Sequence, residues 1–378
     1  MYDLVVKNGL LIDPAQGIHE RKDVALLDGK VAAVEPRIDE SQARRVVDAE
    51  GLIVTPGLID LHVHVCYRIA PLAVDPEAAC LAKGSTTVLD VGSLGNLLFE
   101  GFRRYIIDRS PTRIYALLNV GSLGLIGTAP GEHWPMLYND TFATSLFINP
   151  DETTRVIEAN RDVILGIKWH NTYGRRALAA ARRAADASGG IIMAENHYQP
   201  ETLYFLNRGD ILTHIYHPHR THGVLDPDGK VPSEYYTAMK RGVLFDVGHG
   251  AGSFAWNVAE KAIPQGIRPD TISTDLHTGS INGPAFDMPT TMAKFLHLGF
   301  TLDEVVKAST ARPAEALGKL GEIGTLKPGG AGDVAVFKLE EGKFPLVDVL
   351  KQERMGSQRL VPVTVIKGGE IYRDARQR

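Results

Sequence analysis

Two histidines, His62 and His64, stand two residues apart directly after a short apolar run, residues 57–61. Such a run is typical of a buried parallel strand, in which residues two apart point to the same face. Two imidazoles that leave one face together can hold a metal ion, and histidine is the commonest metal ligand among side chains. The spacing alone is weakly specific, because it arises by chance in many chains. A metal site therefore needs further ligands from elsewhere in the sequence.

Ligand-type side chains stand at the ends of several later strand-like runs. They are Lys168, His197, His214 and Asp275. In a barrel of parallel strands the active site lies at the C-terminal ends of the strands, so these side chains would meet at one face. The sequence therefore predicts a metal site built from several strands.

Lys168 indicates a more specific kind of metal site. It lies at the end of an apolar strand, where burial of an ammonium group would cost free energy. Burial lowers the pKa of a lysine, and the neutral amine can then react with carbon dioxide to give a carbamate. That anion has two oxygens and is suited to bridging two divalent metals. The alternative is a lysine that forms an ion pair or binds the substrate, and the residues alone leave both open.

The elements that must position these residues follow a regular pattern. Strand-like runs alternate with helix-like segments, which predicts repeated β/α units around a parallel sheet. The expected strands are residues 57–61, 86–91, 113–120, 163–169, 190–195, 211–215, 243–247 and 271–274. Eight such strands predict a (β/α)8 TIM barrel. Residues 177–187 and 301–317 predict two of its helices, the second opening with a capping box.

Both ends of the chain are rich in β-forming residues. Residues 23–34 and 363–372 predict hairpins, with turns at 28–29 and 368–369, and residues 333–337 predict a further strand. We expect the two ends to pair into one small β-sandwich domain. The predicted architecture is thus α/β, with the barrel over 55–320 and the sandwich formed by 1–54 and 321–378.

Composition narrows the class of protein. The 378 residues are 44% hydrophobic and 23% charged, as in an ordinary soluble globular protein. The net charge of −4 and the lack of a basic run argue against a nucleic-acid partner. No stretch approaches the roughly 18 apolar residues of a membrane helix. The two cysteines, Cys66 and Cys80, and an N-terminus without the features of a signal peptide predict a cytoplasmic protein.

Three segments give the chain a family resemblance. They are residues 55–64 (TPGLIDLHVH), 309–318 (STARPAEALG) and 324–333 (GTLKPGGAGD). The chain resembles the amidohydrolase superfamily, specifically its dihydroorotase-like members with a two-metal centre. The segments look like the family's first-strand motif, its final barrel helix and its return into the β-sandwich.

The resemblance implies a particular set of ligands. One divalent metal would be held by His62, His64, Asp275 and Lys168, with Lys168 as N6-carboxylysine. His197 and His214 would hold the second, bridged to the first by the carbamate and a hydroxide. Such a pair of metals lowers the pKa of water towards about 7 and polarises a carbonyl, while Asp275 serves as the catalytic proton carrier. These ligands suit zinc, our first choice, although manganese, cobalt or iron would also fit.

Substrate specificity is less clearly marked. Dihydroorotases place an arginine two residues after the second histidine, where this chain has Cys66, so dihydroorotate itself is in doubt. Residues 245–250 and 275–284 look like a subgroup similar to hydrolases of acetylated hydroxy or amino acids, often called dihydroorotases or adenine deaminases. The candidate substrate contacts are Cys66, Tyr67, Arg68, His249 and His277.

Some of these candidates have a structural alternative. Arg68 could reach a carboxylate or lie on the surface, and His249 could contact a carbonyl or serve the fold. Cys66 is interpreted as a small wall residue rather than a nucleophile. The loop that follows the sixth strand, which includes His217, suggests a polar pocket wall.

The leading functional hypothesis is a two-metal hydrolase that cleaves the amide or ester bond of a small acylated acid, such as an N-acetyl amino acid or an O-acetyl hydroxy acid. The alternatives are a cyclic-amide hydrolase, like dihydroorotase, dihydropyrimidinase or hydantoinase, and a nucleobase deaminase. Lys168 argues against one-metal deaminases of the superfamily, and the filled ligand positions argue against a non-catalytic relative. The expected partner is a small-molecule substrate. Assembly into a homo-oligomer through the barrel helices is left open.

Overall fold

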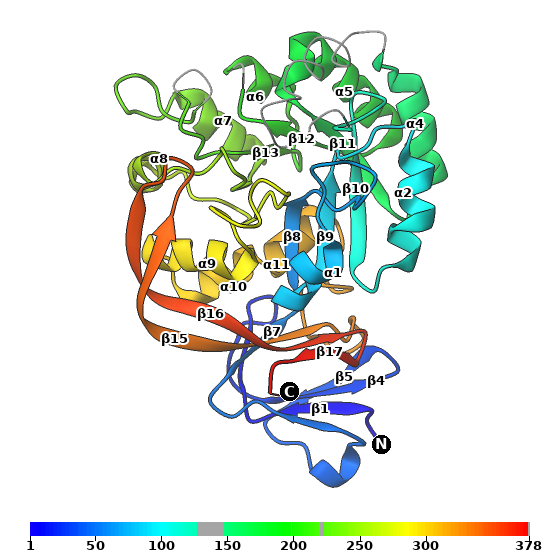
Figure 1. Ribbon diagram of the computed structural model, residues 1–378, viewed down its shortest axis with the longest axis vertical. Helices are drawn as coiled ribbons and strands as arrows, with labels where there is room; N and C mark the ends of the chain where they lie inside the picture. The colour runs from blue at the N-terminus through cyan, green and yellow to red at the C-terminus, as the bar shows by residue number, and fades with distance from the viewer. Residues whose placement is uncertain (127–146, 198, 220–222, 377–378) are drawn as a thin grey trace.

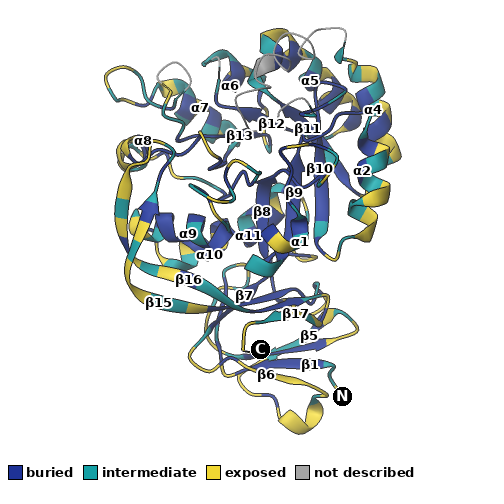
Figure 2. Ribbon diagram, viewed as in Figure 1, coloured by how far each residue is buried: buried dark blue, intermediate teal, exposed yellow. Residues whose placement is uncertain are grey.

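Seven parallel strands form the central sheet of the structure, a computed structural model that describes residues 1–126, 147–197, 199–219 and 223–376 (Figure 1). In chain order, and each beside the next, they are β8 (Leu58–Val63), β9 (Ser85–Val91), β10 (Arg113–Asn119), β11 (Ile164–Trp169), β12 (Ile191–Glu195), β13 (Ile211–Thr213) and β14 (Leu244–Phe245). Most of their residues are buried (Figure 2), as expected for parallel strands covered by helices.

The predicted eighth strand closes this sheet into a barrel without forming a regular strand. A parallel bridge joins Thr271 to Asp246, just after β14, and a second joins Leu276 to Val63 in β8. The segment 271–276 therefore lies between the last and the first strand of the sheet. Seven of the expected strands form, and the eighth segment lies in its predicted place without being a regular strand.

Two buried carboxylates hold this closing segment. Asp246 accepts hydrogen bonds from the hydroxyls of Thr271 and Ser273, both at 2.7 Å. Asp60, in β8, accepts from the amide of Thr274 at 3.0 Å and from its hydroxyl at 2.6 Å. Burial raises the pKa of Asp60 to about 7, against the lowering effect of these bonds. These side-chain bonds add to the backbone bonds of the closing segment, such as those from the amide of Gly250 to the carbonyl of Thr274 at 2.9 Å and from the amide of His64 to the carbonyl of Leu276 at 3.0 Å.

Helices cover the outside of the barrel (Figure 1). They are α1 (Pro76–Ala79), α2 (Phe99–Tyr105), α4 (Pro150–Ala159), α5 (Gly174–Ser188), α6 (Glu201–Phe205), α7 (Ser233–Arg241), α8 (Trp256–Ala262), α9 (Met288–His297), α10 (Leu302–Ala308) and α11 (Ala311–Ala316). Short 3-10 helices are η1 (Glu40–Gln42), η2 (Leu81–Lys83), η3 (Ile107–Arg109), η6 (Asn171–Tyr173) and η7 (Ile263–Gln265). The helix expected over 177–187 is α5. No helix in the described part of the chain is long and apolar enough to cross a membrane.

The prediction of a single helix over 301–317 is wrong, because the segment forms two helices, α10 and α11. The predicted capping box is present at Thr301. The helix is interrupted because the carbonyl of Ser309 accepts a hydrogen bond from the amide of Ile59 at 2.8 Å. Pro313 has no N–H with which to continue the helix to that carbonyl. The break therefore joins the helix end to the start of a barrel strand.

Strands from both ends of the chain form two further sheets. One has the order β5 (Lys30–Glu35), β4 (Asp23–Leu27), β1 (Leu4–Lys7) and β6 (Val46–Asp48). The other has the order β17 (Glu370–Asp374), β16 (Glu353–Lys367), β15 (Val334–Val347), β7 (Ile53–Pro56), β2 (Leu10–Asp13) and β3 (Ile18–Arg21). Val6 of the first sheet and Val54 of the second belong to one hydrophobic cluster. Both predicted hairpins are present, and the termini share a sheet and a core as the sequence predicted.

The hairpin β15–β16 is much longer than the strands predicted at 333–337 and 363–367 (Figure 1). It extends from the lower sheets along the barrel, past α9, to α8. At its tip, the Asp348 carboxylate accepts from the amide of Trp256 at 2.9 Å, and the indole of Trp256 donates to the carbonyl of Gln352 at 3.1 Å. The hairpin therefore reaches the loop that follows β14.

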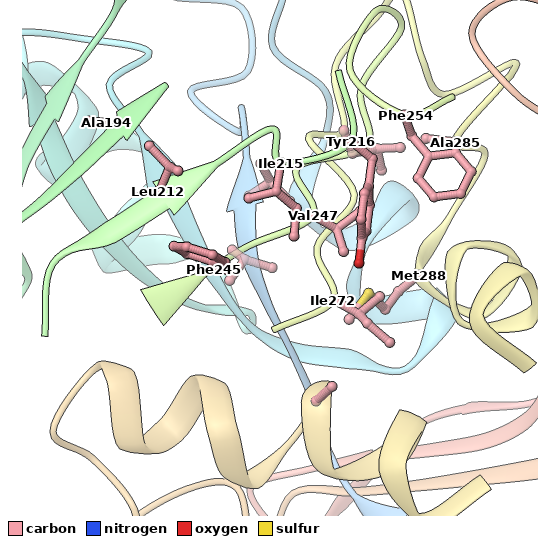
Figure 3. Packing of buried hydrophobic residues seen from close by; sticks show 14 of the residues in the cluster. Ala194, Leu212, Ile215, Tyr216, Phe245, Val247, Phe254, Ile272, Ala285 and Met288 are labelled. Carbon is pink, nitrogen blue, oxygen red and sulfur yellow. The ribbon is translucent and has the colours of Figure 1, made fainter. Parts of the chain in front are cut away.

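Buried side chains support the same loop from inside. Figure 3 shows Tyr216, Phe254 and Met288 packed beside Val247 and Ile272. The rings of Tyr216 and Phe254 meet edge to face, with centroids 6.0 Å apart. Tyr216 lies two residues after His214, and Val247 directly precedes Gly248, so this cluster adjoins residues of the polar site in the sequence.

A buried lysine links this core to the hairpin. Lys294 in α9 donates to the carbonyls of Val347 at 2.7 Å and Pro284 at 2.8 Å, and to Nε2 of His249 at 2.6 Å. Burial lowers the pKa of Lys294 to about 7. The side chain thus joins α9, the hairpin and the loop after β14 at one point.

We predict that Lys294→Met lowers the free energy of unfolding by at least about 2 kcal/mol, because three buried acceptors lose their donor. Between pH 7 and pH 10 the folded chain binds fewer protons at Lys294 than the unfolded chain, so the wild type should gain stability over the variant as the pH rises. Denaturant unfolding at several pH values measures both effects. Lys261→Met on the exposed face of α8 is the control and should change little. Equal stability of Lys294→Met and wild type across this range would contradict the assignment.

Candidate metal centre

Two imidazoles and one carboxylate meet at the mouth of the barrel. His62 and His64 come from the end of β8, and Asp275 comes from the closing segment. Oδ1 of Asp275 lies 3.4 Å from Nε2 of His62 and 3.3 Å from Nε2 of His64. Among the described residues, these three form the group whose ligand atoms all lie within 4.8 Å of one another, and all three are buried.

The hydrogen bonds around His62 leave its Nε2 free to bind a metal. Its Nδ1 lies 2.9 Å from the hydroxyl oxygen of Thr213, and that hydroxyl donates to Asp246 at 2.7 Å. Because the hydroxyl hydrogen is already used, Nδ1 must carry the proton and donate. The lone pair of Nε2 then points towards Asp275. Metal-binding histidines are oriented by such contacts of their other ring nitrogen.

His64 has the same arrangement. Its Nδ1 donates to the hydroxyl of Ser93 at 2.9 Å, and that hydroxyl donates to Asp90 at 2.7 Å. The two histidines from β8 are therefore held in the same tautomer by separate hydroxyl–carboxylate pairs. The chemistry of this donor set fits a divalent metal.

The protonation states of His62 and Asp275 are also those that metal binding requires. Burial, together with the nearby charge of Lys168, lowers the pKa of His62 to about 3, so its imidazole is neutral. Burial alone would raise the pKa of Asp275, but the neighbouring His62 and His64 hold it well below its usual range. Neutral imidazole and ionised carboxylate are the forms that bind metal ions.

A second polar group adjoins the first. It is centred on Glu195, the last residue of β12, whose Oε1 lies 3.4 Å from Nζ of Lys168. The same oxygen lies 3.4 Å from Nε2 of His170 and 3.7 Å from Nε2 of His214. Burial would raise the pKa of Glu195, but the charges of His170 and Lys168 bring it well below the usual value. Glu195 is therefore a buried carboxylate beside two imidazoles and an amine.

His214 is oriented like the histidines of β8. Its Nδ1 donates to the carbonyl of Gly248 at 2.7 Å, which leaves Nε2 as the acceptor that faces Glu195. His214 directly follows β13 and has a positive φ of 63°. The loop after β14 thus sets the direction of a side chain that follows β13.

His197 lies farther along the loop that follows β12. Its two ring nitrogens lie 2.9 and 2.8 Å from the side-chain nitrogen of Asn171, and the residue is half-buried. The structure brings together His62, His64 and Asp275 in one group, and Lys168 and His214 in the other. His197 lines the same cavity as these residues.

Two residues of this group, Glu195 and His170, are not among the candidates predicted from the sequence. A signal existed for Glu195, because it ends a predicted strand, as Lys168 and Asp275 were expected to do. His170 carries no comparable signal, since it follows β11 in a loop whose path the sequence does not define.

A cavity of about 270 Å³ opens onto both groups. Its described lining is His62, His64, Leu72, Val91, Leu125, Lys168, His170, Asn171, Glu195, His197, His214, His217, Ser253, Asp275 and His277. His277 and His217 thus lie on the wall of the cavity. The size of the cavity suits a small molecule.

The other candidate substrate contacts lie outside that lining. Arg68 is exposed, with its guanidinium 5.0 Å from the ring centre of Tyr67. Cys66 is buried, and burial raises the pKa of its thiol, so the thiol is a poor nucleophile. His249 is buried against Lys294 and stacks on Phe254 with ring centres 4.8 Å apart. These contacts give His249 a structural role.

Carboxylates and neutral imidazoles at the C-terminal ends of barrel strands are the components of a hydrolytic metal centre. A sequence model of the amidohydrolase family matches residues 162–372. The chain belongs to this family, and it is an enzyme, a hydrolase.

Individual relatives extend across almost the whole chain. A deacetylase from Agrobacterium fabrum is 31% identical over 85% of this chain and 79% of its own length. Among solved structures, an adenine deaminase is 28% identical, with a TM-score of 0.88 over 99% of this chain and 100% of the other. A dihydroorotase is 26% identical, with a TM-score of 0.86 over 98% of this chain and 99% of the other.

We predict that Thr213→Val weakens divalent-metal binding by about 10- to 100-fold, because His62 loses the acceptor that fixes its ring. Titration of the metal-free protein with zinc in the presence of a competing chelator measures this. The control is Thr237→Val on an exposed turn of α7, which should bind zinc like the wild type. Unchanged affinity of Thr213→Val would show that the hydroxyl does not orient a ligand.

Proposed function

We propose that this enzyme cleaves the amide or ester bond of a small acylated acid, either an N-acetyl amino acid or an O-acetyl hydroxy acid. The observation that carries the proposal is the pair of adjoining polar groups at the barrel mouth, one around Asp275 and one around Lys168 and His214. The similarity to a deacetylase over most of the chain supports the type of substrate.

We infer that the site takes two divalent metal ions, with zinc as the first choice for ligands of this kind. His62, His64, Asp275 and Lys168 would hold one ion, and His214 would contribute to the other. When bound, such ions supply an activated water and polarise the carbonyl that is attacked. The oriented Nε2 atoms and the ionised Asp275 support this assignment.

Lys168 serves the site best as N6-carboxylysine. The neutral amine attacks carbon dioxide, a carbon–nitrogen bond forms, one proton is released, and the side chain becomes an anion. The buried position of Lys168 among ligand-type side chains supports this modification.

Asp275 is the group that moves the proton. Its carboxylate is ionised and faces the cavity, so it can accept a proton from the attacking water and deliver it to the leaving amine or alcohol. His277 and His217 line the same cavity and would orient the acid. The cavity volume of about 270 Å³ is consistent with a small substrate.

A cyclic-amide hydrolase is the second candidate, and the similarity to a dihydroorotase structure favours it. Arg68, the arginine that could bind a substrate carboxylate, is exposed and outside the described lining of the cavity. This observation disfavours dihydroorotate. A nucleobase deaminase rests on the similarity to an adenine deaminase structure alone.

We predict that the zinc-loaded enzyme hydrolyses members of a panel of N-acetyl amino acids and O-acetyl hydroxy acids of both hands. The best of them should reach a kcat/KM at least about 100-fold above those for dihydroorotate, hydantoin and adenine, a gap of about 2.7 kcal/mol. Release of acetate is the measurement. Removal of the metal with a chelator should abolish turnover, and added zinc should restore it. Efficient opening of a cyclic amide without cleavage of any acetyl compound would favour the second candidate instead.

We predict that Lys168→Ala reduces kcat by at least about 100-fold, because the site loses an anionic ligand that positions charge in the transition state. Metal content should fall in parallel, and a small carboxylate such as propionate, added at high concentration, should restore part of both. Mass spectrometry of the gently ionised wild type should detect the added carbon dioxide. A Lys168→Ala enzyme with two metals and full activity would exclude the carbamate.

A further inference from the structure

The carboxylate of Glu195 is fixed in the direction of the site. Its Oε2 accepts a hydrogen bond from the backbone amide of Asn171 at 3.0 Å. Its Oε1 is thereby turned towards Lys168, His170 and His214, at 3.4, 3.4 and 3.7 Å. The side chain is only 6% exposed. Glu195 is therefore aimed and buried, as a ligand would be.

The distances around Glu195 repeat those around Asp275. In each group one carboxylate oxygen lies near two imidazole Nε2 atoms, at 3.3 and 3.4 Å for Asp275 and at 3.4 and 3.7 Å for Glu195. The second group is more open, since among the described residues only the first has all its ligand atoms within 4.8 Å of one another. Each group still offers two imidazoles and one carboxylate, a donor set that suits a divalent metal.

The charges of Lys168 and Glu195 also support a metal ion beside Glu195. With Lys168 as an ammonium, Glu195 has a buried positive partner at 3.4 Å. Carboxylation of Lys168 replaces that partner with an anion, so two negative groups would lie side by side in a buried site. Such a pair is relieved either by a proton on one of the two groups or by a cation between them. A divalent ion in contact with Glu195 and a carboxylated Lys168 relieves the repulsion and leaves both groups ionised.

The backbone sets His197 apart from these groups. The amide of His197 donates to the carbonyl of Glu195 at 2.8 Å, so the chain turns immediately after β12. The alternation of side chains along the strand ends at Glu195 and does not continue to His197. The imidazole of His197 instead lies against the side chain of Asn171.

We propose that Glu195, and not His197, is the β12 ligand of the second divalent metal, with His170 and His214 as its imidazole ligands. The proposal rests on the two-metal function inferred above. His197 is then a side chain of the cavity wall, available to the substrate. The site holds two groups of two histidines and one carboxylate, with Lys168 between them.

The test is the number of metal ions bound per chain and their affinities, measured on the full chain by elemental analysis and by titration with zinc against a chelator. We expect two zinc ions for the wild type. Glu195→Gln should retain one tightly bound ion and lose at least 100-fold in affinity for the other. The matched variant His197→Asn, two residues away, should bind both ions within about twofold of the wild type.

His170→Asn provides a second measurement that does not depend on replacing a buried charge, because the side chain of His170 is 25% exposed. His170→Asn should lower the affinity for the second zinc ion at least tenfold and leave the affinity for the first unchanged. Circular dichroism and thermal unfolding identify any variant that has not folded. If Glu195→Gln does not fold, the affinity of His170→Asn for the second zinc ion tests the proposal by itself.

Two ions of wild-type affinity in Glu195→Gln, or loss of an ion in His197→Asn, would overturn the proposal while leaving the proposed function intact. A wild-type chain that binds a single zinc ion would overturn both. If the wild type binds two ions but cleaves no acetylated acid, the proposed substrate class fails, and the Glu195→Gln titration still decides the ligand.

Discussion

One buried carboxylate, that of Asp246, joins the closure of the barrel to the geometry of the metal centre. It accepts hydrogen bonds from Thr271 and Ser273 in the closing segment and from Thr213 at the end of β13. Thr213 in turn accepts from His62, so the ring orientation of a ligand depends on the same group. A buried charge is tolerated only when its acceptor sites are filled. The same carboxylate therefore takes part both in closing the barrel and in orienting His62.

Most of the barrel is predictable from the sequence, because buried parallel strands are short apolar runs and their ends carry the polar residues of the site. His62, His64 and Asp275 were identified on that basis and lie together. At the end of β12 the residue type favoured His197, although the strand-end position also marked Glu195. Glu195 is the residue that the turn after the strand leaves facing Lys168.

Tertiary contacts account for the other differences. The break between α10 and α11 depends on a carbonyl taken by the amide of Ile59, which no local pattern records. The hairpin β15–β16 continues through charged residues beyond the predicted strands, and its length is explained only by the partners at its tip. The helix expected over 177–187 needed no such contact and matches α5, because its alanines favour a helix locally.

The loop after β14 explains why a histidine between two glycines is structural here. Gly248 offers its carbonyl to His214, and Gly250 approaches Asp275 so closely that a Cβ atom would lie 2.2 Å from its carboxylate oxygen. His249 between them is held by Lys294, which also binds the carbonyl of Val347 in the hairpin. His62 comes from the first strand of the barrel and Asp275 from the segment that closes it. The group that these two residues form with His64 therefore exists only once the barrel has closed.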